Sequence, residues 1–464
     1  MRAYRGHLVH VSGAPLLAQA GDHLVSVPDG VLVVDDDGLI AFSGEYTRMP
    51  GGLASDVADM HVVDCRPGFL LPGFVDTHIH FPQTYCTDSY GGGQLLDWLQ
   101  RCIFPAEAKF ADEEVAQRAA RDFCRRRIDA GTTTAMVFGS AFPAAQDALF
   151  AESARVGLRT ISGRGIQTVG PEAARPLLTD ENSAIELCVS EIDRWHGADP
   201  LLQVALVPRF ALSVTAHTLA ALGELYDSVR AAGVYFHSHL SENLREIDAV
   251  RASLDVSCYL DAYDGRIRGA GAATLLGRRS VLAHAVHCTD GELARLAETG
   301  TSIAHCPTSQ QFLGSGTMPW RRTVASGVNV ALGSDVGAGD EWSIARVAND
   351  CFKVHISEPG DAGLSIPPAE LLFAATLAGA RALDIEDRVG NLDAGKQADF
   401  LVIDPQRQPL LPELLEAVSS GDPDHLLFTL LLGLRETAIA EVFVQGRNVT
   451  SAVSETSLAS RGLP

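Results

Sequence analysis

Eight short apolar runs, separated by stretches rich in Ala, Glu, Arg and Leu, are the feature that most constrains the fold of this chain. The runs have the character of buried strands, and the stretches between most of them, such as Asp112–Ala130 and Asp290–Thr299, are typical of helices. Strands that alternate with helices favour a parallel α/β architecture, and eight such units fit a (β/α)8 barrel. The runs are Phe69–Val75, Thr132–Phe138, Arg159–Ile166, Leu202–Val207, Val234–His237, Ser280–Ala285, Thr301–Ala304 and Asn329–Leu332.

The two ends of the chain differ from this middle. Near the start, short apolar runs are broken by Gly, Asp and Pro, and Asp37-Gly38 is a strong hairpin signal. The end of the chain is similar, with apolar runs at Phe400–Ile403 and Ala440–Val444. We therefore predict an α/β fold: a (β/α)8 TIM barrel with a small composite β-sandwich domain formed by both termini. The predicted limits are 1–68 and 389–464 for the β domain and 69–388 for the barrel.

Polar side chains that can bind metals or move protons follow the predicted strands. A (β/α)8 barrel places its active site at the C-terminal ends of its strands. Residues of these types at several strand ends would therefore meet at one site. They are Asp76, His78 and His80 after the first strand, Arg209 after the fourth, His239 and Glu242 after the fifth, His284 after the sixth, His305 after the seventh and Asp335 after the eighth.

His78 and His80 form a plausible chelating pair. Alternate residues of an extended segment share a face, so both imidazoles can reach one metal ion. His239 and Asp335 add a nitrogen and an oxygen, a mixture that suits Zn²⁺ and also Fe²⁺. The alternative is that histidines such as His284 are core residues satisfied by backbone hydrogen bonds. Their concentration at strand ends favours a metal site.

Glu242 lies three residues after His239 and is close enough to face the same site. A carboxylate beside a metal-bound water can take its proton and pass it to a leaving group. The alternative is a solvated acid that stabilises the start of the next helix. The surrounding residues favour the catalytic interpretation.

Composition limits the partners of the chain. Its 464 residues carry a formal charge of −22, which argues against a nucleic-acid partner because phosphate binding needs Lys and Arg. The nine Cys contain no Cys-x-x-Cys pair, which excludes zinc ribbons and the zinc deaminases of the Pro-Cys-x-x-Cys type. Unpaired thiols, and no apolar core of signal-peptide length at the start, lead us to expect a cytoplasmic protein. The longest apolar stretch, Leu426–Leu434, is too short for a membrane span, and a buried helix is expected there.

Several motifs resemble a known family. Pro72–His80 resembles the first-strand signature of the amidohydrolase superfamily, and the match continues in order along almost the whole chain. Further segments resemble the guanine deaminase family of that superfamily. They are Phe81–Thr84, Gln94–Leu99, Phe104–Phe110, Pro208–Phe210, Ser238–Asn243, Ala304–Ser309, Leu332–Gly339 and Gly390–Phe400.

The resemblance implies hydrolysis of guanine to xanthine and ammonia on one metal ion per subunit, usually zinc, with Fe²⁺ possible. It implies that the protein is a homodimer that acts on a small molecule and water. Matched residue by residue, the implied metal ligands are His78, His80, His239 and Asp335, with His284 either a ligand or only orienting the metal-bound water. The implied catalytic residues are Glu242, as proton shuttle, with His284 and Asp335. The implied substrate-binding residues are Gln83, Arg209, Phe210, His239 and Glu242.

The chain departs from the family pattern at a few positions. Ser334 stands where Thr is common, Gln310 replaces a usual Asn, and Asp340 and Glu341 add two acids after the eighth strand. The last three could alter the rim of the pocket. We therefore keep open deamination of another amino-heterocycle, such as a pterin, oxidised guanine or a triazine. An inactive barrel scaffold is disfavoured because every implied ligand position carries a competent residue.

Overall fold

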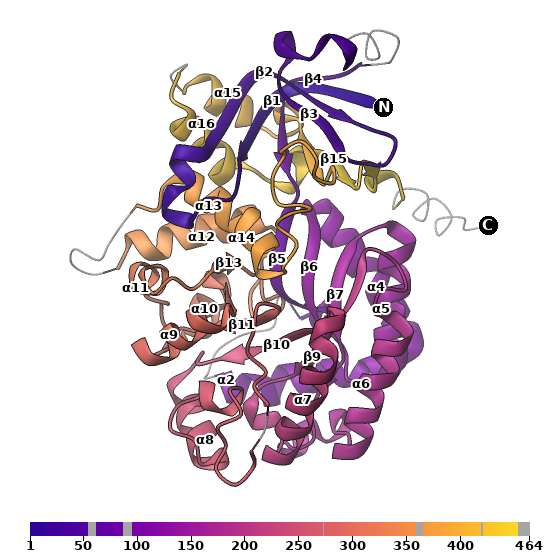
Figure 1. Ribbon diagram of the computed structural model, residues 1–464, viewed down its shortest axis with the longest axis vertical. Coiled ribbons are helices and arrows are strands. Elements are labelled where there is room, and N and C mark those ends of the chain that lie inside the picture. The colour runs from indigo at the N-terminus through magenta and orange to yellow at the C-terminus, as the bar shows by residue number, and fades with distance from the viewer. Residues whose placement is uncertain (54–61, 87–94, 272, 359–364, 419–420, 453–464) are drawn as a thin grey trace.

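The computed structural model describes residues 1–53, 62–86, 95–271, 273–358, 365–418 and 421–452 (Figure 1). Eight parallel strands form the barrel in the hydrogen-bonded order β13-β12-β11-β10-β9-β7-β6-β5, and the short β8 (Gly165–Ile166) pairs with β9. This confirms the predicted (β/α)8 barrel. The strands are β5 (Phe74–His80), β6 (Thr132–Phe138), β7 (Arg159–Gly163), β9 (Leu202–Pro208), β10 (Tyr235–Leu240), β11 (Ser280–His284), β12 (Ser302–His305) and β13 (Val330–Leu332).

The first and last barrel strands approach each other at their C-terminal ends. The backbone N–H of Asp335 donates to the carbonyl of His78 at 2.8 Å, and that of His80 donates to Val336 at 3.0 Å. The Thr77 hydroxyl donates to the carbonyl of Leu332 at 2.8 Å. The sheet therefore curls until β5 and β13 meet, which brings residues 78 and 335 together although they lie at opposite ends of the barrel sequence.

Helices between the strands cover the outside of the barrel (Figure 1). The Asp112 side chain caps α4 by accepting from the N–H groups of Glu114 and Val115, and Thr289 forms a capping box with Glu292 at the start of α9. The helices of this region are α2 (Leu95–Trp98), α3 (Phe104–Glu107), α4 (Glu113–Asp129), α5 (Pro143–Val156), α6 (Glu181–Trp195), α7 (Ala216–Val229), α8 (Leu244–Leu254), α9 (Asp290–Thr299), α10 (Pro307–Leu313), α11 (Trp320–Ala325), α12 (Ile344–Ile356), α13 (Pro368–Ala375) and α14 (Leu377–Ala382).

Strands from both ends of the chain form a second, mixed sheet, as expected (Figure 1). Its seven strands are hydrogen-bonded in one continuous order, β16-β15-β14-β4-β1-β2-β3. Strand β14 lies antiparallel to β4, with Phe400 opposite Pro72, and this pairing joins the two termini. The strands are β1 (Arg2–Val11), β2 (Leu24–Val34), β3 (Ile40–Glu45), β4 (Val62–Pro72), β14 (Phe400–Ile403), β15 (Ile439–Val444) and β16 (Arg447–Asn448).

The first predicted strand, Phe69–Val75, is in fact shared by two strands. Residues up to Pro72 belong to β4 of the mixed sheet, and β5 of the barrel starts at Phe74. Gly73 separates them, and a Cβ there would lie 2.2 Å from Thr133 Oγ1, so the close approach of β6 requires glycine. One apolar run therefore serves two sheets, and the predicted domain limit at residue 68 falls inside β4.

The apolar stretch Leu426–Leu434 is a helix, as predicted. It lies mainly in α16 (Pro423–Gly433), which follows α15 (Leu411–Glu416). Leu427, Leu430 and Leu431 are buried in the main hydrophobic core. Among the described residues, no helix is both long and apolar enough to cross a membrane.

Candidate active site

Four histidines and one aspartate meet at the C-terminal ends of the barrel strands. Asp335, which follows β13, places Oδ1 3.1 Å from His78 Nε2 and 3.0 Å from His80 Nε2. The two imidazole Nε2 atoms lie 3.2 Å apart. His80 Nε2 also lies 3.3 Å from His239 Nε2. We call His78, His80, His239, His284 and Asp335 the strand-end cluster.

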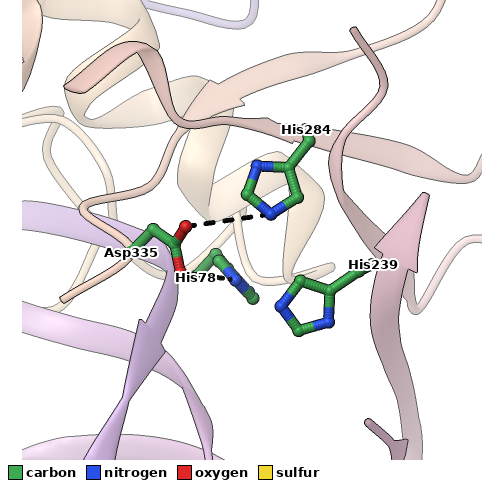
Figure 2. Close-up of side chains that lie close together, drawn as sticks. All are labelled: His78, His239, His284 and Asp335. Atoms are coloured by element: carbon green, nitrogen blue, oxygen red, sulfur yellow. Dashed lines mark ion pairs between the residues drawn. The ribbon is translucent and has the colours of Figure 1, made fainter. Parts of the chain in front are cut away.

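His284 completes the strand-end cluster from the end of β11. Figure 2 shows its ring facing Asp335, with His78 and His239 pointing toward the same space. Its Nε2 lies 3.8 Å from Asp335 Oδ2, and its ring stacks on His239 at 5.4 Å between centroids. The structure thus brings together all five residues that the sequence predicted as metal ligands.

The strand-end cluster has the properties of a metal site. Asp335 Oδ1, His80 Nδ1 and both ring nitrogens of His284 are buried and have no hydrogen-bond partner among the described residues. Buried polar atoms without partners are costly, and a bound cation would satisfy converging lone pairs. His78, His239, His284 and Asp335 have ligand atoms that all lie within 4.8 Å of one another. Nitrogen and oxygen donors in this arrangement could hold one divalent metal ion.

Glu242 lies beside the strand-end cluster, as predicted. Its Oε2 is 3.5 Å from His284 Nε2, and its Oε1 accepts a hydrogen bond of 2.9 Å from the Ser315 hydroxyl. Burial, reinforced by the negative charge of Asp335, raises the pKa of Glu242 to about 8. A carboxyl group with a raised pKa can hold a proton near neutral pH and release it within the site.

Three residues at the strand ends around the site have a positive φ, a backbone conformation that residues other than glycine rarely adopt. Ser241, His284 and Asp335 have φ values of 48°, 75° and 52°. Such conformations cost of order 1–3 kcal/mol each and persist where surrounding contacts hold them. These conformations occur at the ends of three strands. They indicate that the backbone there is held in a less stable conformation that orients the side chains of the site.

A pocket of about 390 Å³ opens onto the strand-end cluster. The predicted substrate-binding residues Gln83, Arg209 and Phe210 all line it, and so does Glu242. The other lining residues are His80, Leu95, Trp98, Leu99, Glu246, His239, His284, Leu313, Asp335 and Ala338. The pocket is therefore polar at the strand ends and apolar where α2 covers it.

Sequence reasoning missed Glu107, which holds two of the pocket residues. Its Oε2 lies 2.5 Å from Arg209 Nη1, and its Oε1 accepts from Gln83 Nε2 at 2.8 Å. All three side chains are buried. Glu107 was part of a recognised segment, but its contact with Arg209 spans 102 residues and no local spacing predicts it. The only sequence feature that could have indicated Glu107 is that it is a charged residue within the largely apolar segment Phe104–Phe110.

The positions that depart from the family pattern do not line the pocket among the described residues. Gln310 is buried and its Nε2 faces His305 Nδ1 at 3.5 Å. Glu341 accepts from the N–H of Ser343 at 2.9 Å and faces Arg346. Neither Gln310, Asp340 nor Glu341 is among the described residues that line the pocket. His305 was expected to meet the other strand-end residues, but it lies outside the strand-end cluster, and its Nε2 instead faces His355 Nε2 at 3.1 Å.

Comparison with known proteins places these features in one family. Residues 69–449 match the Amidohydrolase family. A probable guanine deaminase from Deinococcus radiodurans is 39% identical over 424 residues, which cover 91% of this chain and 93% of the relative. The solved E. coli guanine deaminase superposes with a TM-score of 0.86 at 31% identity, covering 97% of this chain and 98% of that one. The guanine deaminase from C. acetobutylicum, solved with guanine in its active site, gives 0.84 at 25% identity and covers 96% and 99%.

Proposed function

The chain belongs to the amidohydrolase family, and we propose that it is a guanine deaminase that hydrolyses guanine to xanthine and ammonia. The observation that carries this proposal is the shared pocket: Gln83, Arg209 and Phe210 line the same cavity as Glu242 and the strand-end cluster. Groups suited to a purine thus adjoin groups suited to hydrolysis. The guanine deaminases among the solved structures support the same reaction.

We propose Zn²⁺ as the metal, one ion per chain, with Fe²⁺ as an ion that the same donors could accept. His78, His80, His239 and Asp335 would hold it, and His284 faces the same space from β11. When bound, such an ion acts as a Lewis acid that lowers the pKa of water from 15.7 to about 7.

Arg209 and Gln83 would hold the edge of the guanine ring. The guanidinium group of Arg209 has five N–H donors. Its Nη1 donates to Glu107, and the donors that remain could bind the O6 carbonyl of guanine. Gln83 donates to Glu107 and accepts from the N–H of Gly337 at 3.2 Å, which fixes its amide orientation. Phe210 would lie beside the ring. Adenine lacks the carbonyl and would leave buried donors of Arg209 unpaired, so it is rejected.

Glu242 would carry the proton through the reaction. It takes a proton from the attacking water, and the oxygen forms a bond to C2 of guanine while Glu242 delivers that proton to ring N3. Glu242 then takes the proton of the C2 hydroxyl and passes it to the amino group, so that the C2–N bond breaks, the C2 carbonyl of xanthine forms and ammonia leaves. His284 and Asp335 orient the water, and Ser315 holds Glu242 through its 2.9 Å hydrogen bond.

The setting of the enzyme is also part of the proposal. We propose a cytoplasmic homodimer that acts on free guanine and water, without a nucleic-acid or membrane partner. A formal charge of −22 supports the exclusion of polyanions, and a neutral purine base needs no basic surface.

The direct test is ammonia release from guanine by the purified, metal-loaded protein. A Glu242→Gln variant serves as the control, because it keeps the volume of the side chain and removes the carboxyl group. We expect the variant to lose about 10³-fold or more in kcat, in the upper range for general acid–base catalysis, while it keeps its metal. Wild-type activity no higher than that of Glu242→Gln would refute the proposed function.

A further inference from the structure

His237 is a buried histidine that neither the sequence prediction nor the proposed reaction uses. It lies on β10, two residues before His239, and its side chain is fully buried. Its ring is 4.8 Å from that of His78 between centroids. Both of its ring nitrogens have a partner, and these partners show which of the two nitrogens carries the hydrogen.

The first partner fixes where His237 carries its proton. Nδ1 lies 2.8 Å from the carbonyl oxygen of Val281 on β11. A carbonyl oxygen can only accept, so Nδ1 must carry the hydrogen. In the neutral imidazole the other nitrogen, Nε2, then has a lone pair and no hydrogen. A doubly protonated His237 would be a fully buried cation, which is costly, so His237 is the neutral imidazole.

The second partner of His237 is His78, and this contact determines which nitrogen of His78 carries a hydrogen. The Nε2 lone pair of His237 lies 2.7 Å from His78 Nδ1, so His78 Nδ1 must carry a hydrogen and donate it. The remaining nitrogen of His78, Nε2, is then a bare lone pair. It points to the strand-end cluster, 3.1 Å from Asp335 Oδ1 and 3.2 Å from His80 Nε2.

We propose that His237 is a positioning residue for the metal site: through the Val281 carbonyl it holds His78 in the tautomer whose Nε2 lone pair faces the metal. The inference rests on the metal site of the proposed function and extends it to a residue outside the ligand set. Hydrogen-bonded partners of metal-binding histidines fix the tautomer and ring orientation, and their loss costs about 10–100-fold in metal affinity or activity.

The role of His237 can be tested by substitution, whereas the group that holds His239 cannot be replaced in this way. His239 is held by the same principle, but directly by a backbone carbonyl: its Nδ1 lies 2.5 Å from the oxygen of Arg209. That carbonyl cannot be removed by substitution. His80 Nδ1 has no partner among the described residues. Among these three ligands, His78 alone is held through a side chain that can be replaced.

The experiment compares His237→Leu with His237→Gln and measures zinc affinity by competition with a chelator. Leu removes both hydrogen bonds, whereas the Gln amide oxygen can still accept from His78 Nδ1. We expect the dissociation constant for zinc to rise about 10–100-fold in His237→Leu and to stay within about threefold of wild type in His237→Gln. His355→Leu is the matched control, because it removes a buried, hydrogen-bonded histidine outside the strand-end cluster, and it should bind zinc as wild type does.

Wild-type zinc affinity in His237→Leu overturns the inference, and so does equal weakening in His237→Gln and His237→Leu. A second measurement serves if His237→Leu does not fold: ¹⁵N-histidine NMR of metal-free wild-type protein, with the His78 signals assigned by a His78→Gln variant. We expect a hydrogen on His78 Nδ1 and none on Nε2, and a hydrogen on Nε2 overturns the inference. Zinc binding by wild type without guanine turnover would refute the reaction but leave this inference standing.

Discussion

The barrel strands carry residues of two histidine clusters, and the two clusters differ in the hydrogen-bond partners of their imidazole nitrogens. The strand-end cluster has already been defined. The second, which we call the α12 cluster, consists of His305, Cys351 and His355, all buried, with ligand atoms within 4.8 Å of one another. The closest imidazole nitrogens are 3.2 Å apart in the strand-end cluster and 3.1 Å apart in the α12 cluster. Residue type and spacing alone therefore do not separate the two.

Hydrogen bonding does separate them. In the α12 cluster, Gln310 donates to His305 Nδ1, His305 Nε2 donates to His355 Nε2, and His355 Nδ1 donates to Glu358 at 2.5 Å. Both ring nitrogens of His305 and of His355 therefore have a hydrogen-bond partner without any cation. In the strand-end cluster the outer nitrogens of His78 and His239 are held by His237 and the Arg209 carbonyl, so their lone pairs turn inward toward Asp335. A metal site is thus recognised by several nitrogen and oxygen lone pairs that point to one place where no hydrogen-bond donor meets them.

The largest expected effect separates the clusters by metal content. His239→Ala removes one lone pair from the strand-end cluster, and we expect the protein to lose its metal and at least about 10³-fold in guanine turnover, because the ion supplies the activated water. His355→Ala should keep both. Elemental analysis of the purified proteins checks this. Loss of metal in His355→Ala, or two metal ions per wild-type chain, would break the distinction between the clusters.

The next effect separates substrate recognition from metal binding. Arg209→Ala should lower kcat/KM for guanine about 10–100-fold, the value of a charge-assisted hydrogen bond of ~1.5–3 kcal/mol, without changing metal content. The substitution also strands the buried carboxylate of Glu107. The double variant Arg209→Ala/Glu107→Gln controls for that charge and should show the same loss of kcat/KM. A fall in metal content would mean that Arg209 acts through the strand-end cluster.

The α12 cluster should contribute to stability alone. His355→Leu leaves the Nε2–H of His305 buried without an acceptor, which costs about 1–3 kcal/mol of unfolding free energy. Urea unfolding of metal-loaded protein measures this loss, and the steady-state rate with guanine should be unchanged. A changed rate at unchanged stability would contradict the structural role given to this cluster.

The smallest effect concerns how firmly Glu242 is held. Ser315→Ala removes one hydrogen bond to its carboxyl group, worth about 0.5–1.5 kcal/mol, and we expect kcat to fall about 3–10-fold with KM unchanged. Ser315→Thr keeps the hydroxyl and should restore most of the rate. A raised KM with unchanged kcat would place Ser315 in substrate binding instead.

Local patterns predicted most of the site, and long-range contacts supplied the rest. His78 and His80 were predictable because alternate residues of one strand share a face, and Glu242 because it follows His239 closely. Glu107, His237 and Ser315 were not, because their hydrogen bonds to Arg209, His78 and Glu242 span 102, 159 and 73 residues. Such contacts depend on how the barrel closes.

The fold shows the same division. The helix Asp290–Thr299 and the strand Thr132–Phe138 have the bounds that their composition predicted. The run Phe69–Val75 was read as one strand, since apolar character does not reveal that Gly73 passes the chain from one sheet to another. The single continuous order of the seven-stranded sheet depends on the pairing of β4 with β14, far apart in sequence.

We propose that the strand-end cluster, together with the substrate-binding residues Gln83 and Arg209, makes this chain a guanine deaminase. The most direct test is kcat/KM for ammonia release from guanine, a pterin and an aminotriazine, measured on protein whose metal content is counted in parallel. We expect one metal ion per chain and a kcat/KM for guanine well above those of the other two rings. A value for guanine well below that of the pterin or the triazine, at full metal content, would contradict it.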